Sequence, residues 1–206
     1  MLKSALGRAL VRRLGAARAD DVIADVAAHL RPGNRILDVG AGTCQIAARL
    51  VADGFAVTAV DVRDQSCEPS VVPELVDGLT LPFAADAFDV ALLITVLHHT
   101  RRPDHVLAEA ARVARRVIVQ EDIHDTEFER RATMVMDSVV NLELLGHPHS
   151  NRSDQEWRAA FARLGLEVVA ASRKRFWRWF QSATYLLEPS SRARSPAVPC
   201  DPRAVR

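Results

Sequence analysis

The sequence predicts an α/β domain built on a doubly wound, mostly parallel β-sheet. Strand-like apolar runs alternate with amphipathic segments of helical period, as in successive βαβ units. A glycine turn, DVGAG at residues 38–42, follows the first of these runs directly. The run FDVALLITV at residues 88–96 is apolar almost throughout, which is typical of a parallel strand buried on both faces. The 206 residues suit one domain with a sizeable core.

The chain begins with two predicted helices. Apolar residues recur at intervals of four over the first of them, at Leu2, Leu6, Leu10 and Leu14. The second covers residues 19–30 and should end before Pro32 and Gly33. We therefore expect an N-terminal helical segment over residues 1–31.

The remaining elements follow in alternation. Strands are expected at residues 35–40, 56–62, 88–96, 116–120, 166–172 and 179–188, with a short one near Pro73. Helices are expected at residues 43–52, from Pro103 onward, over 128–142, and after Ser153, where Glu156 completes a capping box. Residues 189–206 are rich in Ser, Pro, Arg and Ala and predict a disordered tail, which leaves 1–188 as a single domain.

Composition indicates a soluble protein of a reducing compartment. Hydrophobic residues make up 49% and charged residues 26% of the chain. No apolar run approaches the roughly 18 residues of a membrane span, and the N-terminus lacks a signal-peptide pattern. The three cysteines contain no CxxC pair, which argues against a disulfide scaffold or a zinc knuckle. We expect a cytoplasmic location.

Charge is distributed unevenly around a net value of +1. Residues 1–18 carry five basic and no acidic side chains, and residues 173–206 carry eight basic and two acidic ones. Together with RKRFWRWF at 173–180, these ends predict a peripheral membrane contact. The alternatives are that the termini are simply solvated, or that the first helix covers a cleft and Trp177, Trp179 and Phe180 line the core. No interleaved basic and aromatic motif supports nucleic acid as a partner.

The glycine turn predicts a nucleotide-type ligand at the carboxyl ends of the strands. A dinucleotide fingerprint needs a third glycine, but Gln45 stands at that position. This disfavours a nicotinamide or flavin cofactor. Asp61, at the end of the second long strand, is placed to accept hydrogen bonds from ribose hydroxyls.

At this point the chain resembles class I S-adenosylmethionine-dependent methyltransferases, specifically the type 11 group that includes ubiquinone and menaquinone methyltransferases. The resemblance rests on ILDVGAGT (36–43), VTAVDV (57–62), LVDGLTLPFAADAFDVALLITVLHHT (75–100) and EAARVARRVIVQED (109–122). It implies a Rossmann-like sheet of seven strands, with helices on both faces and the last strand antiparallel. It also implies S-adenosyl-L-methionine as the cofactor.

The resemblance further implies a set of cofactor-binding residues. The aminoacyl end of the cofactor would lie against Asp38, the turn Gly40, Ala41 and Gly42, and the backbone of Thr95 and Val96. The ribose would contact Asp61 and Val62. The adenine would contact Asp77 and Gly78. Carboxylates and carbonyls suit a ligand that carries sulfonium and ammonium charges. The alternative is that Asp38 and Asp77 merely cap turns.

Two features depart from the family pattern. Cys44 occupies the family's usual third glycine position, so we expect its buried, neutral thiol to narrow the cofactor pocket. Only RDQSCEPSV separates Val62 from the next strand, so an irregular loop should replace the helix that is common there.

Polar residues that could serve catalysis follow the fourth and fifth long strands. They are His98, His99, Glu121, Asp122, His124, Asn141, His147 and His149. Three interpretations remain open: a general base, His98 or His147, oriented by Glu121 or Asp122; a divalent metal site, for which the spacing matches no tight ligand motif; and a purely structural role. We select His98, Glu121 and His147 as catalytic and predict no metal site.

The sequence thus predicts an S-adenosylmethionine-dependent methyltransferase that acts on a small-molecule acceptor. O-methylation is favoured because a histidine-rich pocket suits hydroxyl deprotonation, and the acceptor is expected to be hydrophobic. The alternative function is a non-catalytic S-adenosylmethionine-binding regulatory or partner protein. The oligomeric state stays open.

Overall fold

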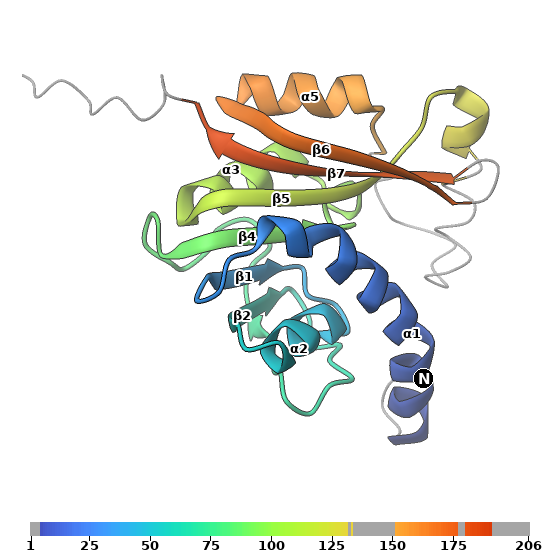
Figure 1. Ribbon diagram of the computed structural model, residues 1–206, viewed down its shortest axis with the longest axis vertical. Coiled ribbons are helices and arrows are strands. Elements are labelled where there is room, and N and C mark those ends of the chain that lie inside the picture. The colour runs from blue at the N-terminus through green and yellow to red at the C-terminus, as the bar shows by residue number, and fades with distance from the viewer. Residues whose placement is uncertain (1–4, 132, 134–150, 177–179, 191–206) are drawn as a thin grey trace, which may run out of the picture.

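The computed structural model describes residues 5–131, 133, 151–176 and 180–190. Its seven strands form one sheet in the order β3-β2-β1-β4-β5-β7-β6 (Figure 1). The strands are β1 (Arg35–Val39), β2 (Ala56–Asp61), β3 (Glu74–Leu75), β4 (Phe88–Ile94), β5 (Ala114–Ile123), β6 (Leu166–Phe176) and β7 (Phe180–Pro189). Only β7 runs against its neighbours, pairing antiparallel with both β5 and β6. The predicted fold class is confirmed.

Helices cover both faces of the sheet. On one face, α1 (Ala5–Val26) and α2 (Gln45–Ala52) pack on a cluster that includes Ile36, Leu50 and Leu92. On the other face, α3 (Pro103–Val113) and α5 (Asp154–Arg163) contribute Leu107, Trp157 and Phe161 to the larger core. The capping box predicted for α5 is present, because Ser153 and Glu156 bond reciprocally. Short 3₁₀ helices at Ala27–His29 and Leu97–His99 complete the described elements.

The N-terminal segment is one long helix rather than the two that were predicted. Its α-helical part ends at Val26 and continues for three residues in 3₁₀ geometry. The residues between the two apolar stripes are mostly alanine and arginine, which favour helix, so nothing interrupts it near Gly15. In Figure 1, α1 crosses the sheet near β4 and continues past the carboxyl ends of β1 and β2.

Two predictions fall at the limits of the described chain. Residues 127–131 and 133 are helical, in agreement with the start of the helix predicted over 128–142, and 134–150 lie outside the described residues. Strand β7 reaches Pro189, where the tail was predicted to begin, and residues 191–206 also lie outside. The division into a domain at 1–188 and a tail stays a prediction.

The connection from β2 to β3 is an irregular loop, as predicted. Residues 62–73 contain no helix. The loop nevertheless buries Cys67 and Val71, and the Cys67 N–H donates to the Thr43 carbonyl over 3.2 Å. The loop therefore packs against the glycine turn and the start of α2 and covers them.

Candidate active site

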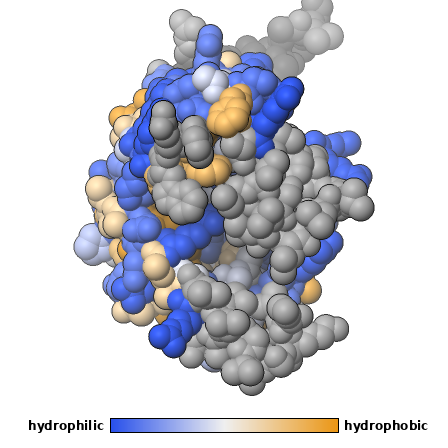
Figure 2. Space-filling model, turned by 90° about the vertical axis from the view of Figure 1, so that its right-hand side faces the viewer, coloured by the Kyte–Doolittle hydropathy of each residue, from blue (hydrophilic) through white to orange (hydrophobic). Residues whose placement is uncertain are grey.

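The parallel strands β2, β1 and β4 end together at one edge of the sheet. Asp38 of β1 is aligned with Ala59 of β2 and Leu92 of β4. Figure 2 shows the molecule from the side at which these strands end, and the described residues there are mostly hydrophilic with a few hydrophobic patches. Ligands of doubly wound sheets bind past this kind of edge.

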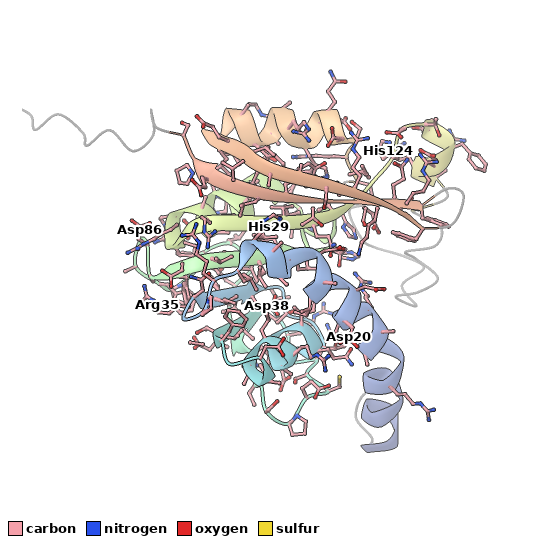
Figure 3. All side chains as sticks on the ribbon, in the orientation of Figure 1. Asp20, His29, Arg35, Asp38, Asp86 and His124 are labelled. Atoms are coloured by element: carbon pink, nitrogen blue, oxygen red, sulfur yellow. The ribbon has the colours of Figure 1, made fainter. Side chains whose placement is uncertain are left out.

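Asp38 is a buried carboxylate with unused hydrogen-bonding capacity. Its side chain is 2% exposed, and its Oδ2 atom has no hydrogen-bond partner among the described residues. It shares a sheet face with Ile36, which lies in the cluster beneath α1 and α2. Figure 3 labels Asp38 near these two helices. Burial, and secondarily the negative charge of Asp61, raise the pKa of Asp38 to about 7. A cationic ligand group would satisfy this oxygen and stabilise its ionised form.

Asp61 closes the glycine turn from the neighbouring strand. Its Oδ2 accepts from the Gly42 N–H over 2.8 Å, and its Oδ1 accepts from the Arg63 N–H over 3.0 Å. Each carboxylate oxygen can accept a further hydrogen bond, so these contacts leave Asp61 able to bind hydroxyl groups. The side chain is 8% exposed, at the mouth of the turn.

Gly40 is required by both its conformation and its neighbour. Its φ of 72° lies in the left-handed region, and a Cβ atom there would come within 2.2 Å of Val96 Cγ2. The turn after β1 is therefore pressed directly against the residues that follow β4. This contact brings together two parts of the predicted cofactor set.

Cys44 adopts the left-handed conformation that a glycine would take, with φ of 59°. Its side chain is fully buried in a small cluster with Ala47, Ala59 and Val71 beneath the 62–73 loop. Because a side chain with no exposed surface cannot line an open pocket, the expectation that Cys44 narrows the cofactor site was wrong. Burial raises the pKa of the Cys44 thiol to about 11, so the thiol is neutral, as predicted.

Asp77 has a different environment from Asp38. It is exposed, and its Oδ1 accepts from the backbone N–H groups of Thr80 and Leu79, each over 2.7 Å. These hydrogen bonds hold its pKa below the usual value. The turn-capping alternative therefore describes the geometry of Asp77, although not that of Asp38. Next to it, a Cβ on Gly78 would lie 2.7 Å from Val62 Cγ1, so Gly78 and Val62 do come together.

Thr95 follows β4 and is held from two sides. Its N–H donates to the Gln120 carbonyl over 2.7 Å, and its φ is 51°. Its Oγ1 accepts from Nη2 of Arg18 in α1 over 2.6 Å. Arg18 was not predicted as a site residue. A signal existed in its spacing from Val22 and Val26, four and eight residues later, which are both buried.

His98 and Glu121 form a buried pair. His98 Nδ1 lies 2.5 Å from Glu121 Oε2, and the side chains are 2% and 0% exposed. The other oxygen of Glu121 accepts from the Leu97 N–H over 2.7 Å. Glu121 thus orients the imidazole and anchors the 3₁₀ turn that carries it. The predicted pairing of these two residues is observed, and their catalytic role stays a prediction.

The other polar candidates are only partly described. His124 directly follows the carboxyl end of β5, and its Nε2 lies 3.4 Å from the Asn151 carbonyl oxygen. Asn141, His147 and His149 lie outside the described residues. Within the described parts of the chain, no group of three or more His, Cys, Asp or Glu side chains could hold a metal ion.

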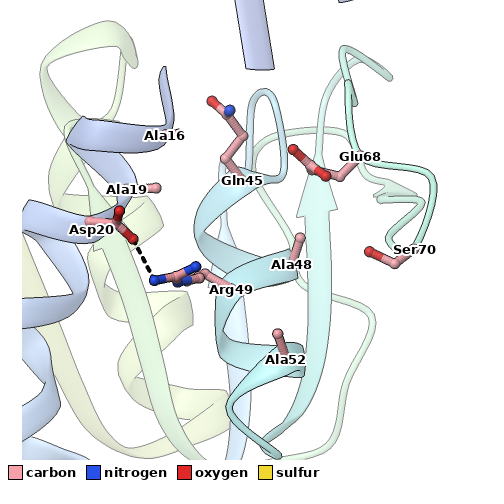
Figure 4. Close-up of a pocket in the computed structure, with 9 residues that line it drawn as sticks. All are labelled: Ala16, Ala19, Asp20, Gln45, Ala48, Arg49, Ala52, Glu68 and Ser70. Carbon is pink, nitrogen blue, oxygen red and sulfur yellow. Dashed lines mark ion pairs between the residues drawn. The ribbon is translucent and has the colours of Figure 1, made fainter. Parts of the chain in front are cut away.

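A groove of about 330 Å³ lies outside the strand edge, between α1, α2 and the 62–73 loop (Figure 4). The Asp20–Arg49 ion pair, at 2.9 Å, spans it from α1 to α2. Its lining combines four alanines of the two helices with polar side chains, and it includes neither Asp38 nor Asp61. We therefore place the chemistry at the strand ends rather than in this groove.

No helix among the described residues is long and apolar enough to cross a membrane.

Comparisons with known proteins agree with this geometry. Residues 37–117 match the family model described as a methyltransferase domain. A 27-O-demethylrifamycin SV methyltransferase from Amycolatopsis mediterranei (strain S699) is 33% identical over 99 residues, which cover 42% of this chain and 36% of that relative. The match thus spans about a third of the length of the curated relative.

Solved structures share the fold at low identity. An S-adenosylmethionine-dependent methyltransferase from Methanosarcina mazei superimposes with a TM-score of 0.64 at 15% identity, covering 80% of this chain and 96% of that chain. Magnesium protoporphyrin IX methyltransferase from Synechocystis PCC 6803, with bound S-adenosylhomocysteine, gives 0.63 at 18% identity, covering 86% and 85%. The resemblance found in the sequence is confirmed over residues 37–117, which match the type 11 methyltransferase domain model.

Proposed function

We propose that this protein is a methyltransferase that moves the methyl group of S-adenosylmethionine to an oxygen atom of a small, hydrophobic acceptor. The observation that carries the proposal is the buried Asp38 carboxylate, whose Oδ2 lacks a partner beside a glycine turn closed by Asp61. A buried unpaired carboxylate is unfavourable unless a ligand satisfies it. The family match over the same residues agrees with this interpretation.

The described residues fit the proposed cofactor. Asp38 would accept from its ammonium group, Asp61 from its ribose hydroxyls, and the close packing of Gly40 on Val96 would form the floor between them. Exposed Asp77 and the Val62–Gly78 contact would border the adenine. When bound, S-adenosylmethionine supplies a methyl group activated by its sulfonium charge.

We further propose that His98 accepts the proton of the acceptor hydroxyl. Because Nδ1 faces Glu121, the proton would pass to Nε2, and the Glu121 carboxylate would stabilise the resulting imidazolium. The burial of both side chains also suits the alternative that the pair only stabilises the Leu97–His99 turn. The two roles predict different pH profiles.

A transfer assay tests the activity. The protein is incubated with S-adenosylmethionine and a panel of phenols, alcohols, amines and thiols, and S-adenosylhomocysteine release is measured. The proposal predicts release with hydroxyl acceptors above a no-acceptor control. Tight cofactor binding without release for any acceptor would instead favour the non-catalytic binding protein.

The variant His98→Gln separates catalysis from structure. It retains hydrogen-bonding groups but cannot take up the proton, so kcat should fall roughly 10²- to 10⁴-fold and its rise with pH should disappear. An unchanged pH profile with only a lower melting temperature would assign His98 a structural role.

The acceptor class receives indirect support. The relative from Amycolatopsis is named for an O-demethylated rifamycin, and the Synechocystis protein for magnesium protoporphyrin IX. Peripheral membrane contact through the basic ends stays a prediction, since Trp177 and Trp179 lie outside the described residues. Flotation with anionic vesicles at low salt tests it, and absence from the floating fraction would reject it.

A further inference from the structure

We infer that Arg18 of α1 binds the α-carboxylate of the methyl donor. This inference rests on the proposed function, and it adds a binding residue to the same site. The donor's amino-acid end is a zwitterion, so it presents a carboxylate as well as an ammonium group. Asp38 can satisfy the ammonium, but a carboxylate requires a donor of hydrogen bonds, preferably a cation.

The packing of α1 places Arg18 at the strand edge. Val22 and Val26 are 5% and 0% exposed and lie in the core cluster that also contains Ile36 and Leu92. Arg18, Val22 and Val26 are spaced four residues apart, so they share one side of the helix. The two valines fix that side against the sheet. Arg18 is one turn farther toward the N-terminus of α1, and α1 runs past the carboxyl ends of β1 and β2 (Figure 1).

The contact with Thr95 locates the guanidinium more closely. Arg18 Nη2 donates to Thr95 Oγ1 over 2.6 Å. Thr95 directly precedes Val96, whose side chain packs against Gly40 of the glycine turn. The guanidinium is therefore next to the end of β4, the strand that borders Asp38 on one side. A single hydrogen bond to a hydroxyl uses one of the five N–H donors of arginine and leaves others for a carboxylate.

Arg63 is another described cation at this edge of the sheet. It follows β2, and its N–H is bonded to Asp61. Since β1 separates β2 from β4, the backbone of Arg63 is displaced from β4 by roughly two strand spacings of about 4.8 Å. Arg63 therefore neighbours the ribose-binding carboxylate, whereas Arg18 neighbours the amino-acid end.

The charges of the assembled site support this division. Asp38, Asp61 and Asp77 carry three negative charges and Arg18 and Arg63 carry two positive charges, which gives a net of −1 when Asp38 is ionised. S-adenosylmethionine carries two positive charges and one negative charge, a net of +1. The arrangement is therefore complementary in net charge and group by group.

Calorimetry with two ligands tests the inference. S-adenosylmethionine and its decarboxylated form both carry the sulfonium and the amine, and only the first has a carboxylate. Each is titrated into the wild type, Arg18→Gln, and the control Arg13→Gln, which removes an exposed arginine from the same helix. Arg18→Gln should weaken S-adenosylmethionine binding roughly 10- to 100-fold and change decarboxylated ligand binding less than about twofold.

The results separate this inference from the proposed function. A wild type that binds neither ligand would reject both. Normal S-adenosylmethionine binding by the wild type, with the same ratio of the two affinities in Arg18→Gln, would overturn the Arg18 assignment and leave the proposed function standing. The control should keep the wild-type ratio, and Thr95→Val, which removes the hydroxyl that holds the guanidinium, should shift the ratio in the same direction as Arg18→Gln by a smaller factor.

Discussion

Replacing Asp38 by Asn should remove a pH-dependent loss of stability. The pKa of Asp38 is raised from 3.8 to about 7 in the folded protein, so between these values the folded state holds a proton that the unfolded state has released. Stability from this group is therefore fully present below about pH 4, and it declines as pH rises until the folded protein has also lost the proton.

The magnitude follows from these two values. Between pH 5 and pH 8, titration of Asp38 lowers the free energy of unfolding by about 2–3 kcal/mol. Asp38→Asn keeps the shape of the side chain and cannot ionise. We expect the difference in unfolding free energy, variant minus wild type, to increase by about that amount between pH 5 and pH 8.

The assay is urea unfolding of both proteins without ligand, followed by circular dichroism at pH 5 and pH 8. Comparing the change with pH cancels any fixed cost of burying the amide. Parallel stability profiles for variant and wild type would refute the reasoning, because they would show that Asp38 is not held in an unfavourable ionised state. The same variant should lose affinity for S-adenosylmethionine.

Substitutions at Gly40, Cys44 and Glu121 test the structure of the site by urea unfolding. Gly40→Ala should lower the free energy of unfolding by about 2–4 kcal/mol, because alanine is unfavourable at this left-handed φ and its Cβ would clash with Val96. Adding Val96→Ala should recover the steric part of this loss. Equal losses in the single and double variants would contradict this contact. Cys44→Gly should change stability by less than about 1 kcal/mol. Cys44→Val should destabilise the protein by more than about 2 kcal/mol, because a β-branched residue is strained at a φ of 59°. Similar values for the two variants would argue against the left-handed turn. Glu121→Ala should cost about 2–4 kcal/mol because it removes the carboxylate that bonds His98 Nδ1 and the Leu97 N–H. A neutral effect would contradict this role of Glu121.

The fold could be predicted because its signals are local. Each long strand is an apolar run bounded by turns, and the capping box at Ser153 involves residues three apart in the sequence. The continuous helix at the N-terminus was missed because Arg18 interrupts the apolar stripe between Leu14 and Val22. The alanines in the same stretch sustain the helix without extending the stripe.

The site could be predicted only in part because its details depend on tertiary packing. Asp38 and Asp77 each end or follow a strand, but one is buried without a partner at Oδ2 and the other caps an exposed turn. The direction of the Cys44 side chain depends on its left-handed φ and on the loop that covers it. Arg18 reaches the site only because Val22 and Val26 fix how α1 crosses the sheet.

The central claim is that carboxylates at the ends of β1 and β2 hold the methyl donor. A crystal structure of the protein with S-adenosylhomocysteine measures this most directly. We predict that the ligand amine lies within about 3 Å of Asp38 Oδ2 and that its ribose hydroxyls lie at a similar distance from Asp61. A ligand seated instead in the groove between α1 and α2, with Asp38 Oδ2 still unpaired, would contradict the account.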